Sequence, residues 1–163
     1  MGYEPERWHD LYVMLGGAAA ALAGLVFVGL SLHAHAVAGD PLYRTRARNL
    51  TAGILYLTIA SMFVLMPGQG LTALGIELIV GGLLLGGLFV ETPLRFWPRL
   101  DGEMRIRMIV ATAACLVSVY GGVSLIAGAG GGLYVVAAAA IAGLAMNVFG
   151  AWSLLLGLAR EPR

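Results

Sequence analysis

Glu77 is the one residue of a charged type that lies well inside a long apolar stretch of the sequence. A charge near the middle of a bilayer costs at least about 2.5 to 3.5 kcal/mol on insertion scales, so such residues face a cavity or a partner. In that setting a carboxyl group relays protons, binds a cation, or joins a ring of carboxylates around an oligomer axis. The structural alternative is a protonated Glu77 that hydrogen-bonds a polar side chain of a neighbouring helix.

Few other polar side chains lie within the apolar stretches. The candidates to hydrogen-bond Glu77 are Thr58, Ser61, Ser118, Tyr120 and Asn147. Asn147 suits a second role as well, because amide side chains often join membrane helices by hydrogen bonds. We take Glu77, Asn147 and Tyr120 as the candidate pathway or buried polar residues.

The chain carries no motif that would assign an enzymatic reaction. It lacks a P-loop, a dinucleotide-binding glycine fingerprint, an H-E-x-x-H motif and a G-x-S-x-G elbow. His33 and His35 are two residues apart and therefore point to different faces of a helix. The single Cys115 has no second cysteine to pair with. We therefore expect no enzyme, no cofactor and no metal site.

The composition is typical of a membrane protein. Of the 163 residues, 60% are hydrophobic and 12% are charged, whereas a soluble domain carries about 25% charged residues. A chain of this length cannot bury so much apolar surface in a single core. We therefore expect the remaining apolar surface to contact lipid. The net charge is only +1, and all ten basic residues are dispersed arginines, which excludes nucleic acid as a partner.

Five stretches are long enough to cross a bilayer, for which a helix needs about 20 mostly apolar residues. They cover residues 11–32, 50–66, 71–90, 108–126 and 133–158. The sequence therefore predicts an all-α bundle of five transmembrane helices that form a single domain over residues 1–163. The uncharged turns at residues 67–70 and 127–132 predict two antiparallel hairpins.

The arginines predict the orientation of the bundle. With five spans, nine arginines fall on one side of the membrane and Arg7 alone falls on the other. Arginine next to a span is retained on the cytoplasmic side. We therefore expect an outside N-terminus and a cytoplasmic C-terminus.

Small residues recur four positions apart on three of the predicted helices, a spacing that lets helix backbones approach closely in lipid. The stripes are Gly16, Ala20 and Gly24; Gly82 and Gly86; and Ala139 and Gly143, continued by Asn147 and Ala151. These faces should pack inside the bundle or against another subunit. Because five short helices cannot easily satisfy them all, we expect a homo-oligomer.

The opening WHDLY at residues 8–12, the Ala- and Gly-rich run at residues 16–28 and the turn Pro67-Gly68-Gln69 resemble small bacterial multi-pass membrane proteins of uncharacterised function. The resemblance covers mainly the first helix. It implies a bacterial inner (cytoplasmic) membrane, and it carries no activity and no site residues across.

Two functions are consistent with these features of the sequence. The first is a small homo-oligomeric channel or transporter for protons, an ion or a small solute, with Glu77 in the pathway. The second is a non-conducting helper or scaffold subunit that packs against a larger membrane complex. A pathway needs a hydrated route to Glu77, whereas a scaffold needs only packed helices and a carboxyl group with a hydrogen-bond partner.

Overall fold

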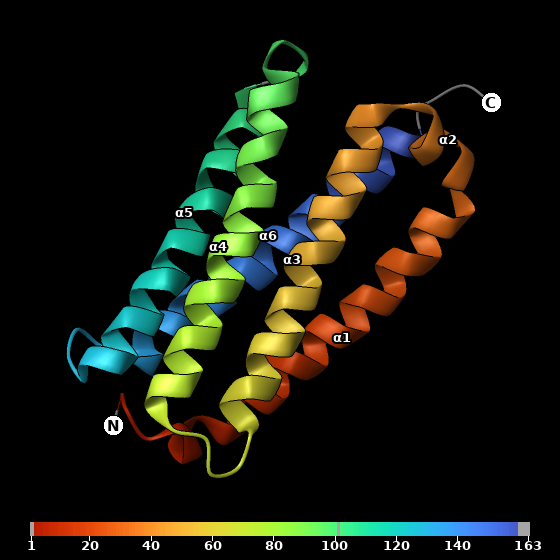
Figure 1. The fold of residues 1–163 in the computed structure, drawn as a ribbon. Coiled ribbons are helices and arrows are strands. Elements are labelled where there is room, and N and C mark those ends of the chain that lie inside the picture. The colour runs from red at the N-terminus through yellow and green to blue at the C-terminus, as the bar shows by residue number, and fades with distance from the viewer. Residues whose placement is uncertain (1, 101, 160–163) are drawn as a thin grey trace.

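The computed structural model describes residues 2–100 and 102–159, and its elements are all helices. Five of them are long and apolar enough to span a membrane (Figure 1). These are α1 (His9–Leu32), α3 (Pro41–Leu65), α4 (Leu71–Phe96), α5 (Gly102–Ala127) and α6 (Leu133–Ala159). A short helix, α2 (Ala34–Gly39), joins α1 to α3, and the 3-10 turns η1 (Pro5–Trp8) and η2 (Trp97–Arg99) precede α1 and follow α4.

The helix α3 begins at Pro41, well before the predicted boundary at residue 50. Asp40 caps it by accepting a hydrogen bond from the Leu42 amide at 2.7 Å, and proline suits the first turn, where its missing N–H is not needed. The helix begins before the predicted span because hydropathy falls at residues 44–49 while the helix continues through them. For the same reason α4 and α5 extend beyond residues 71–90 and 108–126.

The long helices run alternately in opposite directions, so their connections gather at two ends of the bundle (Figure 1). We call one end the Arg-rich end; it holds α2, η2 and the arginines Arg44, Arg46, Arg48, Arg95, Arg99, Arg105 and Arg107. We call the other the hairpin end; it holds η1, Arg7 and the two short turns. Arginine is therefore segregated as predicted, although Arg160, Arg163 and the C-terminus lie outside the described residues.

An ion pair joins the two connections at the Arg-rich end. The Arg99 guanidinium lies 2.5 Å from the Asp40 carboxylate and holds the pKa of that carboxyl below its ordinary value. A lowered pKa keeps the carboxylate charged at neutral pH, so the pair is lost only when the pH falls into the acid range. The start of α3 is thereby tied to the end of α4.

The helices α4 and α5 touch through their backbones. A Cβ placed on Gly75 would lie 2.6 Å from the carbonyl oxygen of Gly122, and one placed on Gly122 would lie 2.5 Å from that of Gly75. Farther along, a Cβ on Gly82 would lie 3.1 Å from the carbonyl oxygen of Cys115. Gly82, from the predicted stripe on this helix, therefore faces α5. Only glycine permits so close an approach at Gly75 and Gly122.

The helix α1 packs against α3 through a different face from the one its small residues suggested. Tyr12, Leu15 and Ala19 are buried, whereas Ala20 and Gly24 are exposed. Of the predicted stripe, only Gly16 is in close contact, because a Cβ there would lie 3.0 Å from the Cβ of Ser61. In the described part of the chain, nothing lies within 4 Å of a Cβ placed on Gly24.

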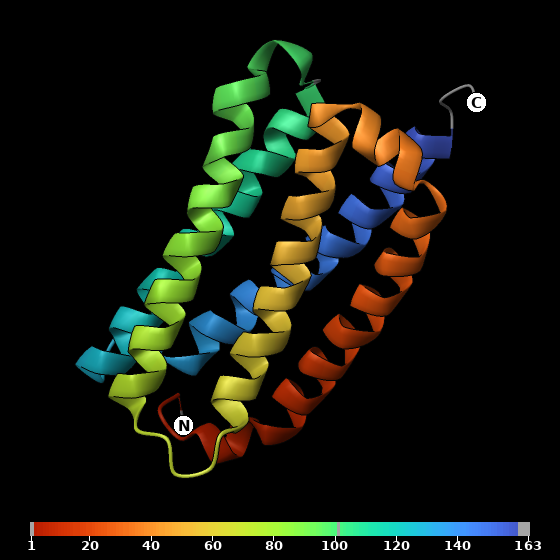
Figure 2. The same ribbon diagram turned by 45° about the vertical axis from the view of Figure 1, so that its right-hand side comes forward.

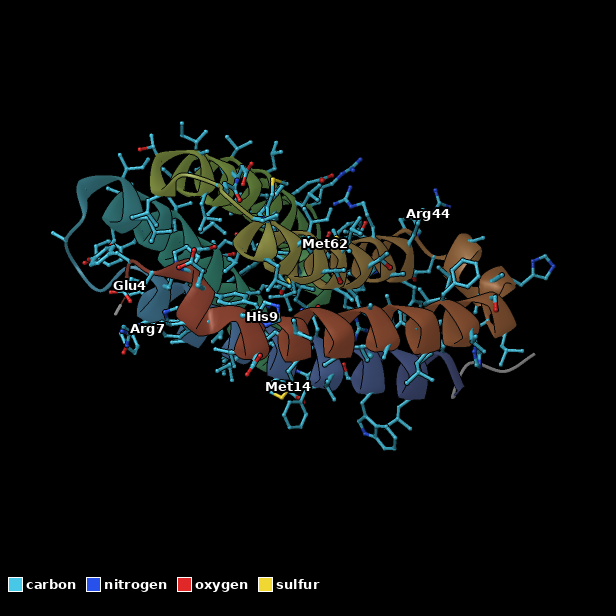
Figure 3. The ribbon with its side chains drawn as sticks, turned by 90° about the horizontal axis from the view of Figure 1, so that it is seen from below. Glu4, Arg7, His9, Met14, Arg44 and Met62 are labelled. Atoms are coloured by element: carbon cyan, nitrogen blue, oxygen red, sulfur yellow. The ribbon has the colours of Figure 1, made fainter. Side chains whose placement is uncertain are left out.

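The outer surface of the bundle is largely apolar. Met14 is 63% exposed and points away from the helices (Figure 3), and Met62 and Leu94 are 61% and 80% exposed. Large apolar surfaces that remain exposed are typical of proteins that contact a membrane or another protein. The exterior therefore agrees with helices that are apolar enough to cross a membrane.

The contact between α4 and α5 predicts opposite effects for two Gly→Ala substitutions. Gly122→Ala should destabilise the bundle by about 1–3 kcal/mol because the new methyl group overlaps the backbone of α4. Gly87→Ala is the matched control, since nothing lies within 4 Å of a Cβ at that position, and it should stabilise α4 by up to about 1 kcal/mol. Unfolding of the purified protein in detergent measures both, and equal effects would contradict backbone contact at Gly122.

Candidate functional site

A cavity of about 140 Å³ lies inside the bundle, with walls from α3, α4, α5 and α6 and a contribution from Tyr12 of α1. Its lining follows α3 from Arg46 to Ser61, which corresponds to about 22 Å of helix at about 1.5 Å per residue. Most of the walls are apolar, and they include Leu57, Leu85, Phe89, Met108 and Ala111. The cavity is therefore long, narrow and mostly apolar.

Small residues on α6 create this space. The predicted stripe places Ala139, Gly143 and Asn147 in the cavity wall rather than in a backbone contact, because a Cβ on Gly143 would lie 3.6 Å from the Leu57 side chain. The helix α6 also crosses the others diagonally (Figure 2). Small side chains on an obliquely placed helix leave a gap that the facing helices do not fill.

Two arginines lie where the cavity opens at the Arg-rich end. The cavity shares Arg46, Met104, Arg107 and Ser153 with a more open hollow of about 430 Å³, which Trp152 and Glu103 also line. Arg46 donates a hydrogen bond to the Ser153 hydroxyl at 3.4 Å, and Arg107 donates one to the same oxygen at 2.5 Å. Two guanidinium groups thus converge on one neutral hydroxyl at the mouth.

Glu103 balances part of this positive charge. Its carboxylate lies 2.5 Å from the Arg107 guanidinium, one helical turn away, and the Glu103 side chain is 74% exposed. An exposed pair of this kind is screened by water and contributes little to stability. Among the described residues that line the mouth, two are arginines and one is acidic.

The hairpin end of the cavity is closed. Tyr12 lines the cavity and is only 1% exposed, and its hydroxyl has no hydrogen-bond partner in the described part of the chain. Leu74, Leu125 and Leu133 pack in the same apolar cluster and are at most 1% exposed. Apolar side chains therefore fill the hairpin end of the bundle beyond the cavity, next to the unpaired Tyr12 hydroxyl.

Two polar groups lie in the middle of the walls. The hydroxyls of Tyr56 on α3 and Ser118 on α5 are 2.5 Å apart and join these helices across the cavity. Asn147 donates a hydrogen bond to the Gly143 carbonyl of its own helix at 2.8 Å. Its side-chain oxygen instead faces Gly53 on α3.

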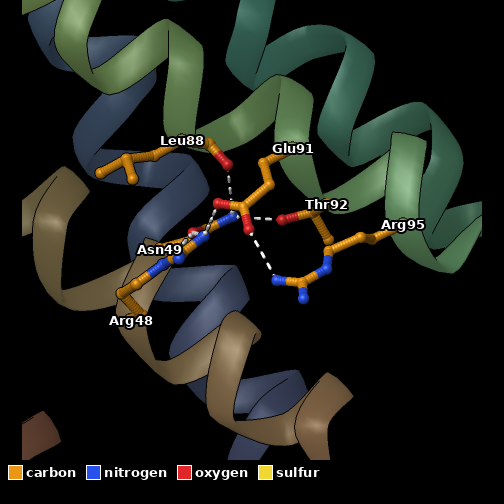
Figure 4. A network of polar contacts seen from close by, with 6 residues as sticks. All are labelled: Arg48, Asn49, Leu88, Glu91, Thr92 and Arg95. Carbon is orange, nitrogen blue, oxygen red and sulfur yellow. Dashed lines mark hydrogen bonds and ion pairs between the residues drawn. The ribbon is translucent and has the colours of Figure 1, made fainter.

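A buried hydrogen bond joins α3 to α4 near the mouth (Figure 4). The Asn49 amide donates to the Thr92 hydroxyl at 2.6 Å and to the Leu88 carbonyl oxygen at 3.4 Å. Asn49 is 3% exposed and Thr92 is 1% exposed, and both line the cavity. Buried polar groups must find such partners, so this bond fixes the spacing of the two helices.

Charged side chains extend this contact outwards. Glu91 accepts from Arg48 of α3 at 2.8 Å and from Arg95 of its own helix at 3.0 Å, and Arg48 also donates to the Asn49 side chain at 3.3 Å. The sequence reasoning missed Asn49 and Glu91 because both lie just outside the predicted spans. The spacing of Glu91 and Arg95, four residues apart, is the signal that the helix continues.

The structure does not bring Glu77, Asn147 and Tyr120 together. Glu77 is half-buried, accepts a hydrogen bond from Gln69 in the turn before α4, and is not part of the cavity lining. Tyr120 is exposed and donates to the Gly130 carbonyl oxygen in the turn after α5 at 3.2 Å. Each side chain binds the turn next to its own helix, which satisfies it locally.

The polar partners proposed for Glu77 are also satisfied elsewhere. Thr58 and Ser61 donate to carbonyl oxygens one turn back on α3, and Ser118 pairs with Tyr56. Within the described residues no group of three or more His, Cys, Asp or Glu side chains could hold a metal ion. The cavity and its mouth are therefore the arrangement best suited to bind a ligand.

Glu77 provides a test of the contact with the turn. Glu77→Gln should leave stability nearly unchanged, because a glutamine oxygen still accepts the hydrogen bond from Gln69. Glu77→Leu should cost about 1–3 kcal/mol, because it leaves the partly buried Gln69 amide without an acceptor. Thermal unfolding in detergent distinguishes the two. If both variants lose the same stability, the charge of Glu77 has a role that this hydrogen bond does not explain.

Comparisons with known proteins returned no relatives. No protein-family model matches the chain, and neither a curated protein nor a solved structure matches it. Any conclusion about function therefore rests on the geometry of the bundle alone.

Proposed function

We propose that the chain is a multi-pass protein of a bacterial inner membrane that admits a small solute to the centre of its bundle and carries it across. Support comes from the cavity, which shares Arg46 and Arg107 with the hollow at the Arg-rich end and meets packed apolar side chains near Tyr12. In this proposal the Arg-rich end faces the cytoplasm, in line with the rule for arginines in short loops. Solute then enters from the cytoplasmic side.

A carrier fits this geometry better than an open pore. A pore needs a continuous route, whereas the apolar cluster around Tyr12, Leu74 and Leu133 closes the hairpin end. In a carrier the closed end opens in a second conformation. The turn after α5 suits such a change, because Gly130, Gly131 and Gly132 adopt positive φ values that glycine enters and leaves at little cost.

Glu77 has a structural role in this proposal. Its carboxylate holds Gln69 and with it the turn between α3 and α4, near the end that must open. The residue lies outside the cavity lining, so the solute does not pass it in the conformation described. A pathway through Glu77 would need a hydrated route from another direction.

One observation favours the alternative of a scaffold subunit. Gly17, Ala20 and Gly24 leave a surface of small residues exposed on α1, and nothing lies within 4 Å of a Cβ at Gly17 or Gly24. Another membrane helix could approach closely there. Such a contact would give the homo-oligomer that the sequence suggests, or would attach the chain to a larger membrane complex.

Two alanines on α5 test whether the cavity is open to water. Ala111 lines the cavity, whereas Ala113 is exposed on the outside of the bundle and does not. With Cys115 replaced by Ser, Ala111→Cys should react with the anionic, membrane-impermeant reagent methanethiosulfonate ethylsulfonate. Ala113→Cys should remain unlabelled, because a thiol in lipid stays protonated and unreactive.

The side from which labelling occurs tests the orientation. We expect faster reaction in inside-out vesicles, where the reagent meets the cytoplasmic face, than in intact cells. Failure of Ala111→Cys to react from either side would rule out an aqueous entrance, and the scaffold function would then be the better conclusion. Equal labelling of both variants would mean that α5 faces water on both sides, which would contradict the proposed placement in a membrane.

A further inference from the structure

We propose that the inner part of the cavity, towards Tyr12, binds a small, uncharged and mostly apolar carbonyl compound. The oxygen of this compound accepts a hydrogen bond from the Tyr12 hydroxyl. The volume of the cavity limits the size of the compound, and the walls determine its polarity. This inference rests on the proposed function, because it names the class of solute that the same cavity admits.

The volume of the cavity limits the ligand to a few carbon atoms. The cavity measures about 140 Å³, which is close to an engineered apolar cavity of about 150 Å³ that binds benzene in another protein. A molecule of about six to eight non-hydrogen atoms is therefore the right size, whereas a lipid chain is too long. Small side chains on α6 provide this room, since Ala139, Ala140 and Gly143 all line the cavity.

The walls behind the mouth favour an uncharged ligand. Arg46 and Arg107 at the mouth are the only charged side chains among the described residues that line the cavity. Farther in, the walls consist mainly of apolar side chains such as Leu57, Leu78 and Leu85. An ion placed there would lose its hydration and find no opposite charge, which is strongly unfavourable. The inner part of the cavity therefore selects an uncharged, mostly apolar molecule.

The Tyr12 hydroxyl calls for one polar atom on that molecule. Tyr12 is 1% exposed, and among the described residues its hydroxyl is the only fully buried side-chain polar group of the cavity lining that has no hydrogen-bond partner. An unpaired buried hydroxyl costs free energy, so such groups usually find a partner. A carbonyl oxygen is the simplest match, because it accepts the hydrogen of Tyr12 and brings no further donor that the wall would have to satisfy.

The neighbouring hydroxyl groups in the cavity wall already have partners. The hydroxyls of Tyr56 and Ser118 pair with each other at 2.5 Å. The Ser61 hydroxyl donates to the Leu57 carbonyl oxygen, one turn back on its own helix, at 2.8 Å. A ligand oxygen gains most where a donor is unused, so we place it next to Tyr12.

A matched pair of probes, bound to the full-length protein in lipid nanodiscs, tests the inference. Cyclohexanone has the carbonyl oxygen, and methylenecyclohexane has nearly the same shape without that oxygen. Saturation-transfer nuclear magnetic resonance measures the saturable binding of each probe. Tyr12→Phe should weaken cyclohexanone binding by about three- to tenfold, because one hydrogen bond is lost, and should leave methylenecyclohexane binding unchanged. Comparing two proteins with the same probe cancels its partitioning into lipid.

Three further variants serve as controls. Tyr134→Phe removes the hydroxyl of an exposed tyrosine outside the cavity lining, and it should bind both probes normally. Ala111→Phe fills the cavity and should abolish the saturable binding of both probes. Ala113→Phe adds the same bulk on the outer face of α5 and should abolish neither. Without ligand, Tyr12→Phe should unfold at the wild-type temperature, because its hydroxyl has no described partner to lose.

The outcomes separate this inference from the proposed function. Equal binding of cyclohexanone by the wild type and Tyr12→Phe would overturn the hydrogen bond to the ligand. A lower unfolding temperature of Tyr12→Phe without ligand would assign the hydroxyl to the fold and overturn the same claim. If Ala111→Cys reacts with the aqueous reagent but neither probe binds, the cavity admits another solute, and only the present inference fails. If both probes bind as expected but Ala111→Cys does not react, the binding site stands and the proposed entry from water fails.

Discussion

The direct contact between the backbones of α4 and α5 is the constraint on which the rest of the bundle depends. Lipid is as apolar as the side chains, so helices in a membrane gain little from burying leucine and associate through close packing instead. Gly75 and Gly122 provide that packing, since a methyl group at either position would overlap the opposite carbonyl oxygen. The pair α4–α5 therefore acts as one unit, and the other helices must fit around it.

Two contacts connect this unit to the remaining helices. At the hairpin end an apolar cluster joins Tyr12 of α1 and Leu133 of α6 to Leu74 and Leu125. Near the Arg-rich end the hydrogen bond between Asn49 and Thr92 joins α3 to α4, and in a low-dielectric interior neither group can give up its partner cheaply. Between these contacts α6 crosses with small side chains, and the cavity is the space that remains.

Much of this arrangement follows from the sequence. Hydropathy and the uncharged turns predict five long helices, and the arginines predict which connections share an end. Hydropathy does not predict the residue at which a helix begins. A helix whose first turn is capped can extend beyond the apolar stretch of the sequence. Asn49 and Glu91, which join α3 to α4, were missed for that reason. The partner of Glu77 was also not predictable, because Gln69 reaches it from a turn that breaks the helical periodicity.

The small residues show a second limit of sequence reasoning. The same spacing of glycine and alanine brings backbones together at Gly82, lines a cavity at Gly143 and lies exposed at Gly24. The pattern predicts a helix face that carries only small side chains. The position of the neighbouring helix determines whether that face forms a close contact, lines a cavity or stays exposed. The tilt of α6, which depends on all its neighbours, is not encoded in any local spacing.

The most direct test of a cavity that water enters from the Arg-rich end is a spin-label scan along α5 in the membrane. The cavity-facing positions Met108, Ala111 and Ser118 are compared with Ile109 and Leu116, which are exposed on the outside, using collision with a water-soluble nickel chelate. We expect strong collision at Met108 and Ala111, a fall to little at Ser118, and little throughout on the outer face. Equally weak collision at Met108, Ala111 and Leu116 would contradict the account.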